Sequence, residues 1–304
     1  MKTLATKFQL EDLGPVSYFL EARITRYRDQ KRFHLAQDSY TRQILEKFGL
    51  ENCRSVDTPM AAGFEVFMVP NTGKATATEI SEYQSKIGSL LYLAIHTRPD
   101  IAYACSAFSR YLSNPSTNHL KGVNRIFHYL KGTTDLGIMY DGNHPHQELH
   151  GYCDSDWGGD KGTRRSTDGS VFFLARGVIS ANAKSQPNVS LSSTEAEYYA
   201  YTSCIQELLW IQQIMSQMQY SGRDITSTLI YSDSQSSLAL GNNPEMHQRT
   251  KHIDIKHHFI REHIEAGRVD ARYISTHEMA ADGLTKLLAK VKFSRFVDML
   301  NLKT

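Results

Sequence analysis

The sequence predicts an α/β protein in which a mixed sheet, flanked by helices, forms the second half of the chain. Short β-prone runs open this half at about 149–183, and further runs then alternate with helical patterns. A turn-rich stretch that contains Gly, Asn and Pro, Asp141–Glu148, separates the halves and predicts a domain boundary. We therefore expect a first part of mixed α and β character at 1–145 and a second part at 146–304.

Composition limits the classes of protein that the chain can be. With 304 residues, of which 40% are apolar, it is long enough for two domains with real cores. The 34 Lys and Arg nearly balance the 32 Asp and Glu, so any binding of nucleic acid must use local basic patches. Four cysteines without a CxxC pair argue against a disulfide scaffold and against a cysteine-rich zinc module. The longest apolar stretch, near Ser89–Ile95, is too short for a bilayer, and no secretory signal is evident, so a soluble intracellular protein is predicted.

The first half reads as a hairpin followed by helices. Val16–Thr25 is a predicted strand, and Lys31–Ala36 is its predicted hairpin partner. A helix that runs through Lys47 is expected to be capped by Asp38 or Ser39. Three more helices and a closing strand are predicted at Ser81–Ile95, Pro99–Leu112, Asn118–Leu130 and Leu136–Tyr140.

The second half reads as five strands and several helices. The strands are predicted at Leu149–Cys153, Ser170–Leu174, Val178–Ala183, Ser227–Tyr231 and Val269–Ile274. Ser192 and Glu195 match a capping box, S-x-x-E, at the start of a long helix. Ser234 is expected to cap a short helix, and Asp254 is expected to open another that ends near Ala266. Short helices complete the chain.

Four acidic residues occupy places from which such a fold can bring them together. Two follow β-prone runs, one lies in the first turns of the long helix, and one lies in a short C-terminal helix. They are Asp154 in YCDSDW, Asp233 in YSDSQSS, Glu197 in SSTEAEYYA and Asp282 in HEMAADGLTK. Two unit charges ~4 Å apart repel by ~4 kcal/mol at an effective dielectric near 20, so such a cluster favours a divalent cation. Oxygen ligands suit Mg²⁺, and two metals held by carboxylates can cleave phosphodiesters.

Other interpretations of these residues stay open at this point. The acids can be ordinary surface charges, because a chain with 32 acids has some near strand ends by chance. Asp156 competes with Asp154 for the first position, and we prefer Asp154 because it lies nearest the predicted strand. Lys161, Arg164 and Arg165 follow shortly afterwards and either bind phosphates or line a solvated loop, with the two arginines favoured as phosphate ligands.

Ordered sequence strings run along nearly the whole chain. Those of the second half are YCDSDWGGD, TRRSTDG, LSSTEAEYYA, YSDSQSS, RTKHIDIKHHFIRE and ADGLTK. They resemble the ribonuclease H domain that ends the Pol polyprotein of copia-type LTR retrotransposons. Upstream strings resemble the region between the reverse-transcriptase palm and that domain, and they are DLGPVSYFL, DTPM, YQSKIGSLLYLAIHTRPDIAYA and RIFHYLKGT.

The resemblance implies a fold and a set of site residues. It implies a ribonuclease H-like mixed five-stranded sheet flanked by helices at 146–304, preceded by a partial thumb-like or connection-like region at 1–145. The catalytic and metal-ligating residues that it implies are Asp154, Glu197, Asp233 and Asp282, which hold Mg²⁺, with Mn²⁺ as a substitute. Gln235 matches a residue that lies near the RNA strand, and Arg164 and Arg165 are further substrate-binding candidates. His277 is the auxiliary candidate that precedes the last Asp, with a solvent-exposed loop histidine as the alternative.

The resemblance also implies an activity and its setting. The expected reaction is hydrolysis of the RNA strand of RNA–DNA hybrids by a two-metal mechanism. The chain contains no adjacent Asp-Asp pair of the kind that the family's palm carries, so polymerase activity is not expected. The missing palm, or the parent polyprotein, is an expected partner, and the expected location is the cytoplasm, within a virus-like particle, or the nucleus. The alternative is a non-catalytic transposon remnant that at most binds nucleic acid.

Overall fold

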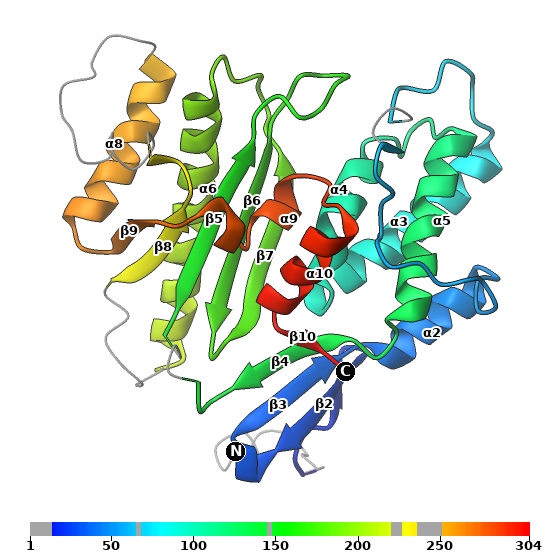
Figure 1. Cartoon of the computed structure of the whole chain (residues 1–304), viewed down its shortest axis with the longest axis horizontal. Helices are drawn as coiled ribbons and strands as arrows, with labels where there is room; N and C mark the ends of the chain where they lie inside the picture. Colours follow the sequence, from blue (N-terminus) through cyan, green and yellow to red (C-terminus); the bar gives the residue numbers. More distant parts are fainter. Residues whose placement is uncertain (1–13, 65–67, 145–147, 220–226, 236–250) are drawn as a thin grey trace, which may run out of the picture.

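Two five-stranded sheets, joined and flanked by helices, make up the molecule (Figure 1). The computed structural model of the chain describes residues 14–64, 68–144, 148–219, 227–235 and 251–304, with side chains in the last range from residue 255. No helix in these ranges is both long enough and apolar enough to cross a membrane. The predicted boundary between residues 145 and 146 lies outside the described ranges, and it stays a prediction.

The first sheet is antiparallel and has the order β1-β2-β3-β4-β10. Its strands are β1 (Tyr18–Phe19), β2 (Ala22–Tyr27), β3 (Arg32–Ala36), β4 (Gly137–Asp141) and β10 (Leu302–Lys303). The predicted hairpin is present as β2 and β3, but the single strand predicted at Val16–Thr25 is wrong. Leu20 and Glu21 take positive φ angles of 50° and 60° and divide it into β1 and β2.

The predicted helices of the first part lie close to their predicted places, and η1 (Arg28–Gln30), a short helix that was not predicted, accompanies them. The others are α2 (Asp38–Lys47), α3 (Ala77–His96), η3 (Pro99–Ile101), α4 (Ala102–Ser109) and α5 (Thr117–Gly132). Helix α3 begins earlier than predicted because Thr76 and Glu79 form a capping box. The helix predicted at Pro99–Leu112 is divided into η3 and α4.

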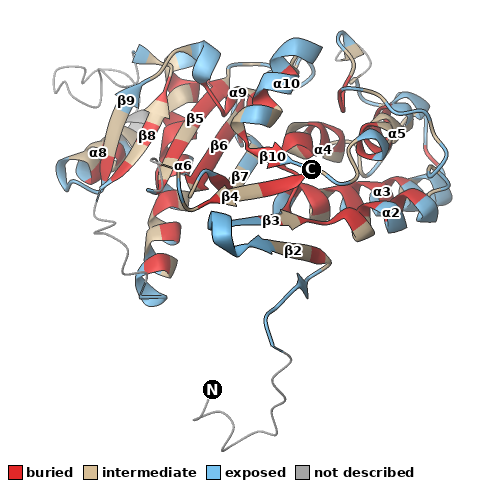
Figure 2. Cartoon of the chain, turned by 60° about the horizontal axis from the view of Figure 1, so that its bottom comes forward, coloured by how far each residue is buried: buried red, intermediate tan, exposed pale blue. Residues whose placement is uncertain are grey.

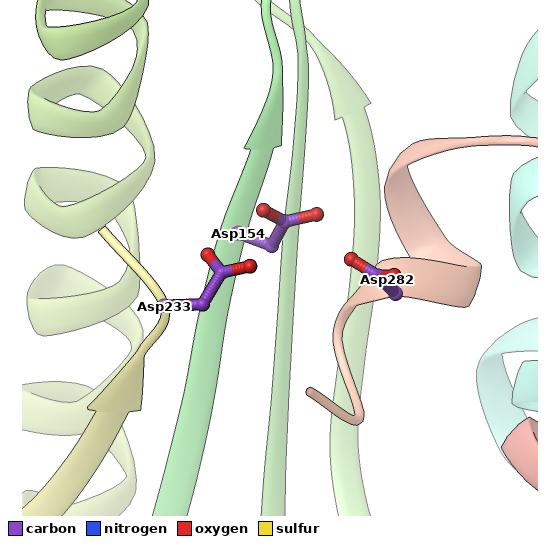
Figure 3. A group of neighbouring side chains, drawn as sticks. All are labelled: Asp154, Asp233 and Asp282. Carbon is purple, nitrogen blue, oxygen red and sulfur yellow. The ribbon is translucent and has the colours of Figure 1, made fainter. Parts of the chain in front are cut away.

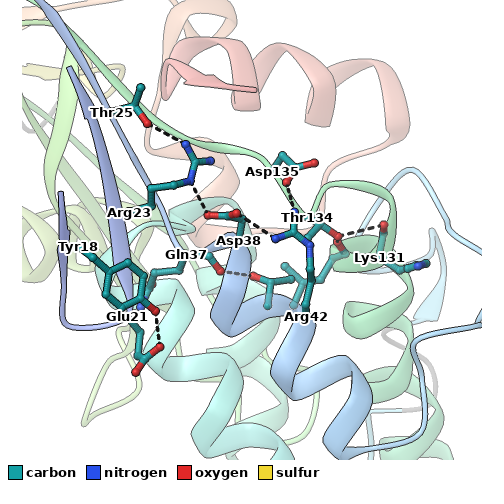
Figure 4. A network of polar contacts seen from close by, with 12 residues as sticks. Tyr18, Glu21, Arg23, Thr25, Gln37, Asp38, Arg42, Lys131, Thr134 and Asp135 are labelled. Carbon is teal, nitrogen blue, oxygen red and sulfur yellow. Dashed lines mark hydrogen bonds and ion pairs between the residues drawn. The ribbon is translucent and has the colours of Figure 1, made fainter. Parts of the chain in front are cut away.

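The predicted cap of α2 is wrong, because the residue at the N-cap is Gln37 and its side chain makes no capping bond. Asp38 lies in the first turn, where its carboxylate accepts from Arg23 Nε and Arg42 Nη1, each at 3.0 Å (Figure 4). Arg42 also reaches Asp135 at 2.5 Å. The acid is therefore used to bind two arginines rather than to cap the helix.

A buried ion pair fixes the start of α4. Arg98 Nη2 lies 2.8 Å from Asp100 Oδ2, and both side chains are almost fully withdrawn from solvent. The Tyr129 hydroxyl of α5 donates to the same carboxylate at 2.7 Å, and Arg98 Nη1 donates to the carbonyl of Thr133 at 2.8 Å. A buried pair survives only when its remaining hydrogen bonds are satisfied, and here α5 and the residue that follows it supply them.

The second sheet is mixed and has the order β7-β6-β5-β8-β9. Its strands are β5 (His150–Asp156), β6 (Thr167–Leu174), β7 (Gly177–Ser185), β8 (Thr228–Ser232) and β9 (Val269–Tyr273). The β5-β6 and β6-β7 pairs are antiparallel, whereas β5-β8 and β8-β9 are parallel. The predicted fold class, a ribonuclease H-like mixed five-stranded sheet flanked by helices, is confirmed.

Helices cover both faces of the second sheet. On one face lies α6 (Ser193–Gln217), beside α8 (Lys251–Glu265), which begins three residues before the predicted Asp254. On the other face lie α4 and α9 (Asp282–Thr285), followed by α10 (Lys290–Met299). Most of the short helix predicted after Ser234 lies outside the described residues.

One hydrophobic core joins the two parts. Phe108 of α4 and Phe127 of α5 share a buried cluster with Val171, Val178 and Leu284, and Figure 2 colours these buried segments red. The chain also returns to the first part at its end, because β10 pairs with β4. Strand β10 was not predicted, since two residues carry no periodic signal. The second sheet therefore rests directly on the first part.

Candidate active site

Three carboxylates from three separate elements meet on the face of the second sheet that α9 covers. Asp154 comes from β5, Asp233 directly follows β8, and Asp282 is the first residue of α9 (Figure 3). One carboxylate oxygen of each lies within 4.8 Å of the other two, and this is the single such acidic group found among the described residues. Three carboxylate oxygens at this separation can act together as ligands of a divalent cation.

Asp154 lies at the centre of the group and is 3% exposed. The prediction that it ends its strand is wrong, because β5 runs on to Asp156 and pairs Asp154 with Gly169. The parallel pairing of β5 with β8 stops at Tyr152, so Asp154 lies past the last residue pair that joins these two strands. Burial raises the pKa of Asp154, although Lys286 and the hydroxyl of Thr285 lower it. Thr285 Oγ1 donates to Asp154 Oδ2 at 2.6 Å and so fixes the carboxylate.

Lys286 supplies a positive charge to the acidic group. Its Nζ lies 2.8 Å from Asp282 Oδ1 and 3.8 Å from Asp154 Oδ2. Burial alone would lower the pKa of Lys286, but the charges of Asp154, Asp282 and Asp156 outweigh burial and raise it. The site therefore attracts a cation, and an ammonium group occupies part of the space between two of its acids.

Asp233 is oriented by the loop that precedes α9. Its Oδ2 accepts a hydrogen bond of 2.7 Å from Thr276 Oγ1, in the short helix η4 (Thr276–Glu278). Unlike the other two members, Asp233 has no ion pair with Lys286 among the contacts of the described residues. Its neighbours Ser234 and Gln235 are outside the acidic group, and the side chain of Gln235 is exposed.

Glu197 lies in the second turn of α6, near enough to Asp154 and Asp233 to feel their charges, but outside the 4.8 Å group. Burial, followed by the charges of Asp154 and Asp233, raises its pKa from 4.5 to about 8. The predicted capping box is half present. Ser192 accepts from the backbone of Glu195, but the Glu195 carboxylate accepts from the backbone of Leu191 instead of Ser192. The start of α6 is nevertheless fixed, and with it the position of Glu197.

A glycine lets α9 approach the sheet closely enough to bring in Asp282. A Cβ atom on Gly169 would lie 2.6 Å from Thr285 Cγ2 and 3.0 Å from the carbonyl of Ala281. Only a residue without a side chain fits at this point of β6, directly opposite Asp154. The glycine of TRRSTDG is thus required by the close packing of ADGLTK against it, although the two segments are more than 100 residues apart.

Asp156, the competitor of Asp154, points elsewhere. Its carboxylate fills the space beside Gly159, where an added Cβ would overlap Oδ2. Burial raises the pKa of Asp156, and the nearby charge of Asp154 adds to the effect while that of Lys286 opposes it. The structure brings Asp154, rather than Asp156, into the group with Asp233 and Asp282.

The remaining predicted site residues lie around the acids. Arg164 and Arg165 are exposed on the loop between β5 and β6, and Arg164 has a positive φ of 59°. His277 is exposed in η4, five residues before Asp282. No contact among the described residues assigns a chemical role to Arg165 or to His277.

Sequence reasoning missed Lys286 and Thr285 as members of the site. Both follow Asp282 within ADGLTK, and Lys286 lies four residues after it, the spacing at which an acid and a base meet on a helix. Asp168, an acid of β6, was also not singled out from the sequence. Burial raises its pKa from 3.8 to about 7, and Gln186 donates to its carboxylate at 2.6 Å.

Relatives of known name match almost the entire chain. The retrovirus-related Pol polyprotein from transposon TNT 1-94 of Nicotiana tabacum is 37% identical over 294 residues, or 95% of the chain. That from transposon RE1 of Arabidopsis thaliana is 35% identical over 300 residues, or 99% of the chain. The chain spans 22% and 20% of the lengths of these two polyproteins. No family model matches it.

Solved structures match the chain less closely than the sequence relatives do. The N-terminal RNase H domain of a Mycobacterium tuberculosis protein, fused to maltose-binding protein, is 13% identical, with a TM-score of 0.33 over 45% of this chain and 95% of that one. A foamy viral protease–reverse transcriptase in complex with double-stranded DNA is 13% identical, with a TM-score of 0.43 over 71% of this chain and 35% of that one. The sequence relatives carry the assignment, and by them the chain belongs to the family of copia-type LTR-retrotransposon Pol polyproteins.

Proposed function

We propose that residues 146–304 form a ribonuclease H domain that hydrolyses the RNA strand of RNA–DNA hybrids and leaves 3′-hydroxyl and 5′-phosphate ends. The observation that carries this proposal is the meeting of Asp154, Asp233 and Asp282, whose oxygens lie within 4.8 Å of one another. Membership of a retrotransposon Pol family supports the choice of a nuclease over other metal-dependent hydrolases.

The donor set fits Mg²⁺. The three aspartates offer oxygen atoms only, which is the ligation that Mg²⁺ and Mn²⁺ prefer, and Glu197 is the fourth ligand in the proposed set. Lys286 already places a positive charge between Asp154 and Asp282. When bound, two such ions would activate a water molecule and stabilise the leaving oxygen of the phosphodiester.

Hydrogen bonds and burial orient the carboxylates of this site. Thr285 and Thr276 fix one oxygen each of Asp154 and Asp233, so the carboxylates are oriented before a substrate arrives. Asp154 is almost fully buried, so little water can reach its carboxylate. A low local dielectric strengthens every charge interaction that the site makes with a phosphate.

Substrate contacts are proposed for exposed residues around the acids. Arg164 and Arg165 would bind phosphates, and Gln235 would lie near the RNA strand. His277 is proposed to help product leave. Recognition should depend on duplex shape and on 2′-hydroxyl groups, because hybrid duplexes are read in this way rather than by base sequence.

The first part, 1–145, is proposed to be a thumb-like or connection-like region that helps to hold the duplex. The reverse-transcriptase palm or the parent polyprotein is its proposed partner. The proposed setting is intracellular, in the cytoplasm or the nucleus.

A cleavage assay tests the proposed function. The chain is incubated with Mg²⁺ and a hybrid whose RNA strand is labelled, beside RNA–RNA and DNA–DNA duplexes. We expect cleavage of the hybrid alone, its loss in Asp154→Asn and Asp233→Asn, and its retention in Asp298→Asn, which changes an exposed acid paired with Lys303 outside the acidic group. If the parent chain binds but does not cut the hybrid, the non-catalytic remnant is the correct interpretation. Cleavage that survives both site substitutions would refute the site.

A further inference from the structure

An arginine of the first part holds a loop of the second part. The loop, 157–166, connects β5 to β6 beside the acids and carries the exposed Arg164 and Arg165. Arg110, the C-cap residue of α4, places Nη1 3.0 Å from Asp160 Oδ2 in this loop and donates from Nη2 to Thr167 Oγ1 at 3.4 Å. The Asp160 side chain is 9% exposed and that of Arg110 22%, so the pair is largely withdrawn from solvent.

Asp160 organises the turn that carries the two arginines. Its carboxylate accepts from the backbone N–H of Gly162 at 2.9 Å and from the hydroxyl of Thr163. Its carbonyl accepts from the backbone N–H of Arg164 at 2.7 Å, and its own N–H donates to the carbonyl of Arg165 at 3.2 Å. A shift of Asp160 would therefore displace both arginines.

The charge on Asp160 is secured by these contacts. Burial alone would raise the pKa of Asp160, but hydrogen bonds from Thr163 and Gly162 and the charge of Arg110 outweigh burial and lower it. Arg110 therefore faces a carboxylate that is ionised at neutral pH, and their contact is charge-assisted.

Helix α4 is a rigid support for Arg110. Its Cys105 and Phe108 are fully buried in the core that also contains Val178 of β7 and Leu284 of α9. The buried Arg98–Asp100 pair fixes the beginning of the same helix. Arg110 therefore projects from an element whose position relative to the second sheet is set by packing.

We infer that Arg110 is a positioning residue for the hybrid, because it holds Asp160 and thereby places Arg164 and Arg165 where they can meet the phosphates. This inference rests on the proposed function. It gives the first part a defined task in substrate binding, although the first part contributes no acid to the three-aspartate group.

Simple electrostatics and positioning predict opposite results for the substitution Asp160→Asn. Removal of an acid near a polyanion should strengthen binding if charge alone decides. Positioning predicts weaker binding, because the amide that replaces the carboxylate would turn donors toward Arg110 and release the loop. This one substitution thus separates the two explanations.

The test measures hybrid binding and cleavage by the full chain. We expect Arg110→Gln and Asp160→Asn each to raise the Kd and KM for the hybrid about tenfold, while kcat stays within about twofold. The dependence of log Kd on log salt should become shallower by about one to two, as contacts of Arg164 and Arg165 with phosphate are lost. The double variant should bind no more weakly than either single variant, because both break the same contact.

A matched ion pair in the first sheet provides the control. Arg32 Nη2 lies 2.7 Å from Asp141 Oδ2, the Asp141 side chain is also 9% exposed, and Asp141 likewise accepts from a backbone N–H two residues on, that of Asn143. Arg32→Gln and Asp141→Asn should leave hybrid binding unchanged. In a chain that carries Arg164→Ala and Arg165→Ala, Arg110→Gln should have no additional effect.

Two results would overturn the inference. One is that Asp160→Asn binds the hybrid as tightly as the parent or more tightly, and the other is that Arg110→Gln lowers kcat with KM unchanged. Thermal unfolding of each variant separates loss of the contact from loss of the fold. A parent chain that neither binds nor cleaves hybrid would refute the proposed function, whereas a parent that cleaves beside an unaffected Asp160→Asn variant would refute this inference alone.

Discussion

Replacement of Asp233 by Asn should make the metal-free protein more stable and remove its stabilisation by Mg²⁺. Asp233 is the best member of the acidic group for this experiment, because Lys286 pairs with Asp154 and Asp282 but not, among the described contacts, with Asp233. Asn can still accept the hydrogen bond from Thr276 that Asp233 accepts now. The substitution therefore removes a charge with little loss of contact.

The magnitude follows from the geometry of the group. Two unit charges 4.8 Å apart repel by about 3.5 kcal/mol at an effective dielectric near 20. Solvent reaches Asp233 and Lys286 offsets part of the negative charge, so we expect a gain of about 1 kcal/mol, or about 2 °C in Tm, in EDTA. At a Mg²⁺ concentration of about 100 times Kd, the parent should gain about 2.7 kcal/mol, and the variant should gain little.

Scanning calorimetry of both proteins, in EDTA and in Mg²⁺, measures these differences. Asp298→Asn is the control, since this exposed acid lies outside the group and should leave the Mg²⁺ shift intact. An Asp233→Asn variant that is less stable than the parent in EDTA and retains the full Mg²⁺ shift would show that the three aspartates neither repel one another nor bind the ion.

Three further predictions concern the same site. Lys286→Met should lower the free energy of unfolding in EDTA by about 1 kcal/mol. It should also tighten Mg²⁺ binding in a calorimetric titration, because the ammonium no longer competes with the ion for the carboxylates. An unchanged Mg²⁺ affinity would contradict this prediction. Gly169→Ala should lower the free energy of unfolding, measured by chemical denaturation, by about 2 kcal/mol, because the added Cβ would meet Thr285 and push α9 from the sheet. A loss below about 0.5 kcal/mol, which is the scatter of surface substitutions, would show that α9 can move away from the sheet at little cost. The pKa of Glu197 is about 8 in the folded protein, against an ordinary value of 4.5, so between these pH values the folded protein binds more protons than the unfolded chain. The Tm of the metal-free protein should therefore fall as pH rises from about 4.5 to about 8, and it should fall less in Glu197→Gln. Equal slopes of Tm against pH in the two proteins would refute the raised pKa of Glu197.

The sequence predicted most of the second sheet because its strands and α6 carry strong local signals. The capping residues Ser192 and Glu195 marked the start of α6 correctly, although the reciprocal bond goes to Leu191. The division between β1 and β2 was missed because it depends on positive φ angles at Leu20 and Glu21, which are residues without a turn preference. Strand β10 depends on pairing with β4, a contact between residues more than 160 positions apart.

The candidate site shows the same division between local and tertiary information. Each acid was recognisable from its neighbours in the sequence, but the end of β5 was placed too early because strand pairing with β6, rather than local propensity, extends it to Asp156. Lys286 could have been found from its i+4 spacing to Asp282. The contact between Arg110 and Asp160 had no signal in the sequence, because it exists only when α4 packs against the second sheet.

Metal binding by the acids is the central claim, and anomalous diffraction from crystals grown with Mn²⁺ measures it directly. We predict a Mn²⁺ peak about 2.1 Å from oxygens of Asp154, Asp233 and Asp282, with the ammonium of Lys286 moved away from its present place between Asp154 and Asp282. Crystals of Asp233→Asn provide the control and should show a weaker peak. An absence of Mn²⁺ at this position in a protein that still cleaves hybrid would contradict the claim.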